Sequence, residues 1–512
     1  MIFGIWWCWL VGMRSILLWY TLAVMHAESN VRSREWPRIF WSLFLLSVVA
    51  LLVVTAETRV AATFLVVSVA LVAVAWRAPY AVLAAWMPLS FLLGIQIAVS
   101  TGYYRVGERT FGTSLEVSIG ETIALALIAA WALRMLLLWR GRRDRHWKPW
   151  LPLALPFSAL MVAHLASLYG PGQPALTAVV HFVLRYQLFL YLACITVVVN
   201  FVRSKKRLRQ VLIAMTVLGV LFAFDGLRNM LVIGPGGVAI RQAQPMAILE
   251  VNLLGGNQHS LAETLIVAMG CALAYAAIVS PTSKRRRWAL SAAGLMFVVT
   301  LLTFSRTAWI VLAFQSLILG ATVFREDVVR YRRELTYALY AAVPLAIVML
   351  VYSLSRGAIG SLDARGALNG IAWTFFQGSP WVGVGAGTFA PRVAGTYAFL
   401  ADFGIPLDSH GILQKVAAEA GLLGLAALGW VLTATARHFW NAWKKIPSGR
   451  PEHVAYAVLV VTAASSFLYQ LTSTSYWTPR LWIPIGLALA AGRIFRRQEA
   501  GRDPDFLRTS HG

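Results

Sequence analysis

The sequence predicts an all-α protein, a polytopic transmembrane bundle of about 12–14 spans. Its composition is 59% hydrophobic and 13% charged, whereas a soluble globular chain carries about 25% charged residues. Apolar runs of roughly 18–22 residues recur from end to end, and each is long enough to cross a bilayer as a helix. These two observations exclude an ordinary soluble domain.

Hydropathy places the expected spans along the chain. They cover residues 39–56, 59–76, 79–99, 119–139, 150–169, 180–202, 209–232, 259–280, 287–303, 307–324, 336–354, 411–435, 455–473 and 480–495. Residues 1–25 are also apolar but contain Arg14 and several tryptophans. They form an extra helix, an interfacial helix or an upstream start-codon artefact, and they are too aromatic for a clean signal peptide.

Basic loops orient these spans. The clusters around Arg32, Arg140, Arg203, Lys284, Arg330, Lys444 and Arg496 all fall on one side of the span list. The positive-inside rule makes that side the cytoplasm and accounts for the net charge of +24, so no nucleic-acid partner is expected. We therefore expect a multi-pass membrane protein in four regions, 1–148, 149–354, 355–410 and 411–512, of which 355–410 is a large outward loop.

Metal and disulfide chemistry find no support. The chain has three cysteines, an odd number, and they lie in apolar segments without metal-ligand spacing: Cys8, Cys194 and Cys271. No His-Glu-x-x-His, Cys-x-x-Cys or Gly-x-Ser-x-Gly motif occurs. We expect no metal and no cofactor, so any phosphate chemistry would depend on arginines.

Arginines on the outward side, or just inside a span that begins there, run against the charge bias, and five of them are candidate binding residues. Arg306 opens a span directly after its predecessor, in Phe304-Ser305-Arg306-Thr307. A cation at a helix N-terminus is disfavoured by about 0.3–1 kcal/mol, so a bound phosphate or carboxylate would explain Arg306, and snorkelling to lipid headgroups is the alternative. Arg185, within a span, is a functional candidate or the partner of a buried carboxylate. The remaining three are Arg365, Arg392 and Arg480.

The outward loop has its own pattern. Residues 363–377 predict a short amphipathic helix with Leu368, Ile371, Ala372 and Phe375 on one face and Arg365 in its first turn. A glycine-rich stretch, 378–387, follows and is expected to be an ordered loop rather than a nucleotide fingerprint.

His410 stands where this loop re-enters the membrane. It is two residues after Asp408 and directly before an apolar run, so it suits general-base chemistry near neutral pH. Asp408 or Ser409 is expected to cap the helix that follows. Glu419 is explained by an ion pair with Lys415, four residues earlier.

Three ordered blocks resemble a known family. They are Ser305-Arg306-Thr307-Ala308; Arg365 followed by Pro380-x-x-Gly383-x-Gly385-x-Gly387-x-Phe389; and Asp408-Ser409-His410 with Gln414, Glu419 and Gly421-Leu422-Leu423-Gly424. The set resembles the O-antigen ligase and Wzy-type polymerase superfamily. Many relatives have Asn after the histidine, where this chain has Gly411.

The resemblance implies a GT-C-like, inverting and metal-independent glycosyltransferase of surface polysaccharide, either lipopolysaccharide or exopolysaccharide. Its donor would be a glycan on undecaprenyl diphosphate, and its acceptor would be lipid A–core or another lipid-linked unit at the periplasmic face. It makes Arg306 a diphosphate ligand, His410 the catalytic base and Arg185 a second diphosphate ligand. We add candidate substrate-binding residues from the outward side: Arg365, Arg392, Asp408, Gln414 and Arg480.

Two other functions remain open. A transporter or flippase of lipid-linked sugars would use the same arginines without a base, and Asp225 is its main candidate for an ionisable residue within a span. A different GT-C enzyme would use acids in the first outward loop, where Glu108 and Glu116 lie eight residues apart.

Overall fold

The structure is a computed structural model. It describes residues 56–92, 96–106, 109–141, 149–171, 175–231, 242–245, 254, 257–334, scattered positions in 336–351, 359–404, 406–473 and 478–499. The chain forms two compact units, Met1–Ala70 and Leu71–Gly512. Of the first unit, the structure describes only the beginning of helix α3 (Ala56–Arg77). The apolar stretch 1–25 and nearly all of the expected spans 39–56 and 336–354 lie outside the described residues.

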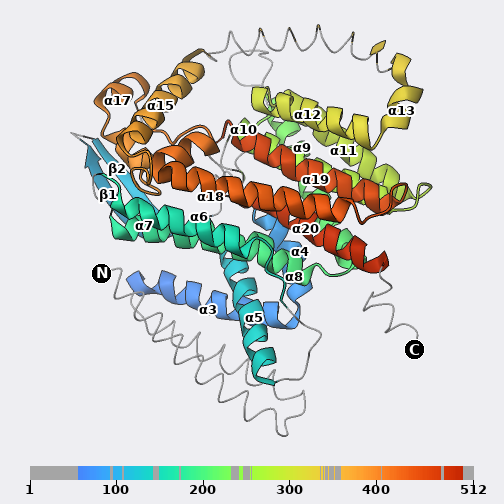
Figure 1. Cartoon of the computed structure of the whole chain (residues 1–512), viewed down its shortest axis with the longest axis horizontal. Helices are drawn as coiled ribbons and strands as arrows, with labels where there is room; N and C mark the ends of the chain where they lie inside the picture. Colours follow the sequence, from blue (N-terminus) through green and yellow to red (C-terminus); the bar gives the residue numbers. More distant parts are fainter. Residues whose placement is uncertain are drawn as a thin grey trace. The chain divides into compact units, whose positions relative to one another are not determined.

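Helices dominate the described chain (Figure 1). Six helical segments in it are long and apolar enough to cross a membrane. They belong to α5 (Ile119–Gly141), the run α7–η2–η3–α8 (Leu176–Phe182, Val183–Leu188, Tyr191–Val197, Val198–Phe201), α9 (Lys205–Leu231), α10 (Gln258–Ile278), α18 (Ile412–Trp443) and α19 (Pro451–Gln470). The predicted all-α, polytopic membrane bundle is thereby confirmed.

Other expected spans also form helices. They are α4 (Pro79–Leu89), α6 (Ala154–Ala166) with the short turn η1 (Ser167–Tyr169), α11 (Lys284–Leu302), α12 (Arg306–Thr322) and α20 (Pro479–Glu499). The outward loop contains α15 (Ile359–Gly378), α16 (Phe389–Ala394) and α17 (Tyr397–Phe403), and α13 (Arg325–Arg330) follows α12.

One expected span is wrong in its second half. Helix α4 contains Pro88 and ends at Leu89, so residues 79–99 do not form a single helix. The chain continues as a hairpin in which β1 (Gln96–Val106) pairs antiparallel with β2 (Arg109–Ser118). Proline ends the helix, and the β-branched and aromatic residues beyond it favour a strand. Part of the expected outward loop 100–118 is therefore regular structure.

Helix α10 lies at the centre of the second unit. Nearly all of its side chains are buried, and it packs against α9, α11 and α19. Gly270 permits the closest of these approaches, because a Cβ there would lie 1.9 Å from Thr462 Oγ1 of α19. This packing fixes the ends of α10, one of which carries site residues.

The helices of the second unit present two groups of ends. The starts of α9 and α19 meet through an ion pair between Lys205 and Glu452; we call this the basic end. The starts of α10 and α12 meet the end of α19 through hydrogen bonds, and the backbone at Leu471, just after α19, lies close to Gly411 at the start of α18. We call this second group the His410 end.

Candidate active site

The turn between α11 and α12 presents Arg306 at the His410 end. Phe304 adopts a positive φ of 53°, which reverses the chain between the two helices. Ser305 caps α12 by accepting a hydrogen bond from the N–H of Ala308 at 3.4 Å. The expectation that Arg306 opens a helix is confirmed, so its guanidinium adds to the positive end of the helix dipole.

His259 lies beside this turn and was missed in the sequence analysis. Its Nδ1 is 3.0 Å from Ser305 Oγ, and its carbonyl accepts a hydrogen bond of 2.9 Å from the hydroxyl of Tyr469. Three helices, α10, α12 and α19, thus converge on the residue that precedes Arg306. The signal was available, because His259 stands just before an apolar run, as His410 does.

Arg365 and His410 complete a group of two arginines and two histidines. The pKa of Arg365 is lowered by burial and by the charge of Arg306, whereas Tyr469 acts in the opposite direction. His259 lies within electrostatic range of Arg365, His410 and Arg306. These residues therefore lie within electrostatic range of one another. We call Arg306, Arg365, His410 and His259 the cationic cluster.

The His410 ring is suited to accept a proton. Burial and the neighbouring Arg365 lower its pKa from 6.5, and Asp408 partly opposes this shift. The ring is therefore largely neutral at pH 7 and has a lone pair available. An imidazole with a lowered pKa thus lies within electrostatic range of a guanidinium group, an arrangement that pairs a base with an anion-binding surface.

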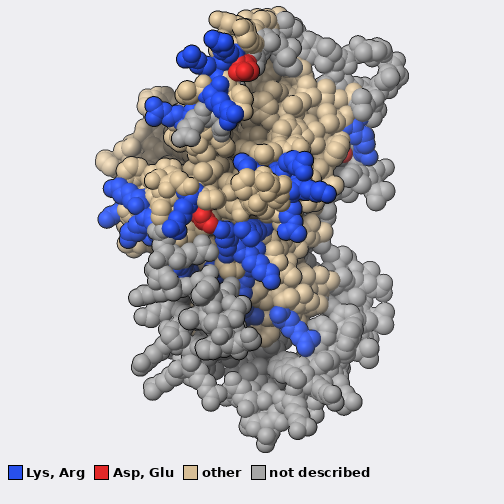
Figure 2. Space-filling view, turned by 90° about the vertical axis from the view of Figure 1, so that its right-hand side faces the viewer, with Lys and Arg blue, Asp and Glu red and all other residues tan. Residues whose placement is uncertain are grey.

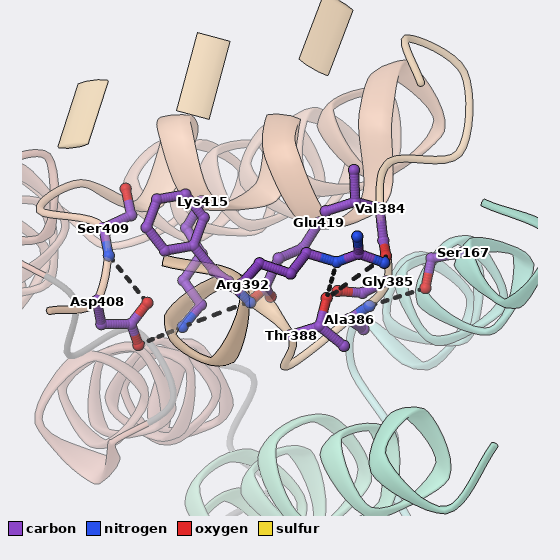
Figure 3. A network of polar contacts seen from close by, with 11 residues as sticks. Ser167, Val384, Gly385, Ala386, Thr388, Arg392, Asp408, Ser409, Lys415 and Glu419 are labelled. Carbon is purple, nitrogen blue, oxygen red and sulfur yellow. Dashed lines mark hydrogen bonds and ion pairs between the residues drawn. The ribbon is translucent and has the colours of Figure 1, made fainter. Parts of the chain in front are cut away.

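Asp408 does not cap α18 as expected. Helix α18 begins at Ile412 after Gly411, and no side chain caps it. Asp408 instead accepts hydrogen bonds from the N–H of Ser409 at 2.9 Å and from Lys415 Nζ at 2.5 Å (Figure 3). Lys415 also lies 3.7 Å from Glu419, so the expected pair between these two residues is confirmed. The ion pair with Lys415 thus takes the place of the expected cap.

The glycine-rich loop after α15 fills a break in α18. Gly421 has φ 62° and ψ −155°, which interrupts the helix. The N–H groups of Leu422 and Leu423 consequently donate to the carbonyls of Pro380 (2.8 Å) and Trp381 (3.2 Å). In return, Val384 and Gly385 donate to the carbonyls of Ala418 (2.9 Å) and Glu419 (3.1 Å). We call this exchange of backbone hydrogen bonds the interlock.

Two glycines make the interlock possible. A Cβ on Gly383 would lie 2.2 Å from the carbonyl carbon of Glu419, and one on Gly421 would lie 2.5 Å from that of Trp381. Both residues also have positive φ, which glycine adopts without strain. Two sequence blocks that were treated separately therefore form one unit, and this unit connects α15, which carries Arg365, to α18, which follows His410.

Three of the predicted substrate-binding arginines have protein partners. Arg185, in the π-helical turn η2, binds Glu121 through Nε at 3.0 Å and Nη2 at 3.1 Å. Arg392 donates to Thr388 and to the carbonyls of Val384 and Pro171. Arg480 is 1% exposed and pairs with Glu263 at 3.3 Å. These contacts stabilise the fold, and a role of the three arginines in substrate binding stays a prediction.

Gln414 and Gly411 lie against each other. A Cβ at Gly411 would meet Gln414 Oε1 at 2.0 Å and the carbonyl oxygen of Leu471 at 2.9 Å. The Oε1 atom is buried, and the described part of the chain gives it no hydrogen-bond partner. Glycine at position 411 thus leaves room for the Gln414 amide one turn below His410.

The alternatives gain little from the structure. Asp225, the candidate of the transporter hypothesis, lies 3.6 Å from Arg228 in the last turns of α9. Glu116 lies in strand β2, opposite Ala98, and Glu108 is outside the described residues. No group of three or more His, Cys, Asp or Glu residues that could hold a metal occurs among the described positions.

Fold and site together define a multi-pass helical membrane protein with cationic groups and a neutral imidazole at one end of its bundle. Residues 291–429 match a family model described as O-antigen ligase. This match confirms the resemblance over that segment and supports an enzyme of the ligase or polymerase type. The matched segment includes Arg306, Arg365 and His410. No match was found among curated proteins.

Proposed function

We propose that this protein transfers a glycan from undecaprenyl diphosphate to an acceptor hydroxyl at the periplasmic face of the inner membrane. The acceptor is lipid A–core or a second lipid-linked glycan. One observation carries the proposal: Arg365 and Arg306 lie within electrostatic range of each other, and His410 lies within range of Arg365. Such a group of cations matches a diphosphate, because guanidinium groups bind phosphate oxygens in two-point fashion.

The reaction follows from these positions. His410 takes the proton of the acceptor hydroxyl while its oxygen attacks the anomeric carbon of the donor glycan. The bond between that carbon and the phosphate oxygen breaks, and undecaprenyl diphosphate leaves with the bonding electrons. Arg306 and Arg365 neutralise the charge that develops on the leaving oxygen, as preorganised cations do in a site of low dielectric constant. A single displacement of this kind inverts the anomeric configuration.

The surrounding contacts support this division of roles. Ser305, fixed by α12 and His259, holds the turn that presents Arg306. The interlock connects the helix of Arg365 to the helix that follows His410. Both reacting halves, the anion site and the base, are therefore attached to packed helices rather than to a free loop.

Transfer of labelled glycan in proteoliposomes tests the proposal. His410→Asn should lower the rate by about 10²- to 10⁴-fold, the usual contribution of a general base, and Arg306→Gln by about 10²- to 10³-fold. His438→Asn, a change of the same kind on α18 away from the cluster, should leave the rate unchanged. A wild-type rate from His410→Asn would contradict the role of base.

The same vesicles separate the alternatives. Glycan found on lipid A–core identifies a ligase, whereas a lengthened glycan on undecaprenyl diphosphate identifies a polymerase. A transporter would move the labelled lipid across the bilayer without forming either product, and that result would overturn the proposal.

A further inference from the structure

A pocket of about 530 Å³ lies at the basic end, where α3 ends and α4 begins. Its walls come from the α3–α4 junction, from α5 through Arg134 and from α9 through Gln210. Because α9 begins at the basic end, this pocket is at the opposite end of the bundle from the cationic cluster. Nothing in the proposed reaction uses it.

The polar lining of this pocket is cationic. Arg77 and Arg134 line it, and the described lining contains no Asp or Glu. Arg134 is held in place: it donates to the carbonyl of Trp76 and lies 5.1 Å from the centre of the Trp76 ring. Arg77 is exposed, and the described chain gives it no hydrogen bond or ion pair. One fixed and one available guanidinium therefore face the same space.

More positive charge surrounds the Tyr80 side of the pocket. The guanidinium carbon of Arg207 lies 3.2 Å from the centre of the Tyr80 ring. Burial, together with the charges of Arg497 and Arg207, lowers the pKa of Arg203 to about 10, although Tyr80 acts in the opposite direction. Lys and Arg also gather in groups on the face shown in Figure 2, with few acids between them. An anion near this pocket would relieve part of the repulsion.

The other wall of the pocket is apolar. Ala81 and Ala84 line it from α4, and residues 71–76 of α3, directly before Arg77, are apolar. A free phosphate would use only the cationic wall. A phospholipid would use both walls, since its phosphate would meet the arginines and its acyl chains would lie along the apolar helices. Basic pockets between membrane helices bind anionic headgroups in this way.

We propose that the pocket lined by Arg77 and Arg134 binds an anionic phospholipid through its headgroup phosphate. The site belongs to the leaflet that the basic loops face, away from the proposed donor site. The lipid would bridge the α3–α4 junction, α5 and α9, and would thereby stabilise the part of the bundle that carries no catalytic group.

Lipid binding to the full chain in detergent tests this proposal. Native mass spectrometry would count the bound lipid, and the thermal unfolding midpoint would report stabilisation. The probes are phosphatidylglycerol, phosphatidylcholine and inorganic phosphate. We expect phosphatidylglycerol to bind and to raise the midpoint more than phosphatidylcholine. Arg77→Gln should weaken phosphatidylglycerol binding about fivefold, the effect of removing one cation near a membrane surface.

Two further variants make the result interpretable. Lys445→Gln removes an exposed cation elsewhere at the basic end and should leave phosphatidylglycerol affinity unchanged. Arg134→Gln should weaken binding as well, but it also removes the Trp76 contacts, so Arg77→Gln is the decisive variant. Equal phosphatidylglycerol affinity in the wild type and Arg77→Gln would overturn the site. Equal stabilisation by inorganic phosphate would overturn the lipid assignment.

Discussion

Arg480 and Arg365 are both removed from bulk water, but they meet opposite neighbours. Arg480 is 1% exposed and pairs with Glu263, itself 2% exposed. Arg365 is half-buried, and the nearby charge that shifts its pKa belongs to another arginine, Arg306. A guanidinium beside a carboxylate is neutralised within the fold, whereas repulsion between two guanidiniums is relieved when an anion binds near them.

This contrast separates structural from functional arginines better than position in the sequence does. The span list placed both residues on the same outward side, where both run against the charge bias. A structural arginine should affect stability when it is removed, and a ligand-binding arginine should affect turnover. The following predictions test that separation.

The largest stability effect is expected at Arg480. Arg480→Met leaves Glu263 buried without its cation, and breaking a buried ion pair costs about 3–5 kcal/mol. The double variant Arg480→Met/Glu263→Gln should recover most of this loss, because no unpaired charge remains. Thermal unfolding in detergent measures both. A single variant as stable as the wild type would show that the pair does not support the fold.

Removal of Arg365 should act on turnover instead. Arg365→Gln should lower glycan transfer by about 10²-fold and leave stability unchanged or slightly higher, since repulsion with Arg306 disappears. Arg228→Gln, at an exposed arginine in the last turn of α9, is the matched control and should transfer at the wild-type rate. If Arg365→Gln lost as much stability as is expected for Arg480→Met, the distinction between a structural and a ligand-binding arginine would fail.

The interlock should tolerate no side chain at Gly383, where the loop backbone approaches α18 most closely. Gly383→Ala should destabilise the protein by about 1–3 kcal/mol, because alanine at positive φ is strained and its Cβ meets backbone. Gly429→Ala on α18 has open space around it and should be neutral or stabilising by up to about 1 kcal/mol. Unfolding midpoints compare the two. Similar values would mean that the backbone approach is not tight.

The smallest effect concerns pH. Because the pKa of His410 is lowered from 6.5, transfer should be constant at neutral pH and fall as pH drops through that pKa. Arg365→Gln removes a charge that lowers this pKa, so the acid limb should move to higher pH. Asp408→Asn removes a charge that raises it, so the limb should move down. Profiles of kcat/KM against pH test both, and shifts of the same sign would contradict the assignment.

Much of the fold followed from hydropathy and helix signals. Long apolar runs gave the helices, and Ser305-Arg306 marked the start of α12. The hairpin β1–β2 did not follow, because the apolar stretch 79–99 has the hydropathy of a span and only Pro88 reveals its end. The amphipathic helix at Arg365 was expected and is longer than expected, so Arg365 lies in its second turn.

The candidate site was predictable as a set of charges but not as a set of pairs. Positions against the charge bias identified Arg306 and Arg365, and they identified Arg480 equally. Only the packing of distant helices shows that Arg480 forms an ion pair with Glu263. The same is true of the electrostatic repulsion between Arg365 and Arg306. His259 stands before an apolar run, as His410 does, but only its contact with Ser305, 46 positions away, shows that it belongs to this site.

The interlock makes the loop between α15 and α18 inseparable from the membrane domain. Val384 and Gly385 donate their N–H groups to α18, and Pro380 and Trp381 accept from it. An excised fragment of residues 359–410 would present these four backbone groups to water and lose the surface that shapes it. Antibodies raised against such a water-soluble fragment would therefore recognise conformations that the intact protein does not adopt.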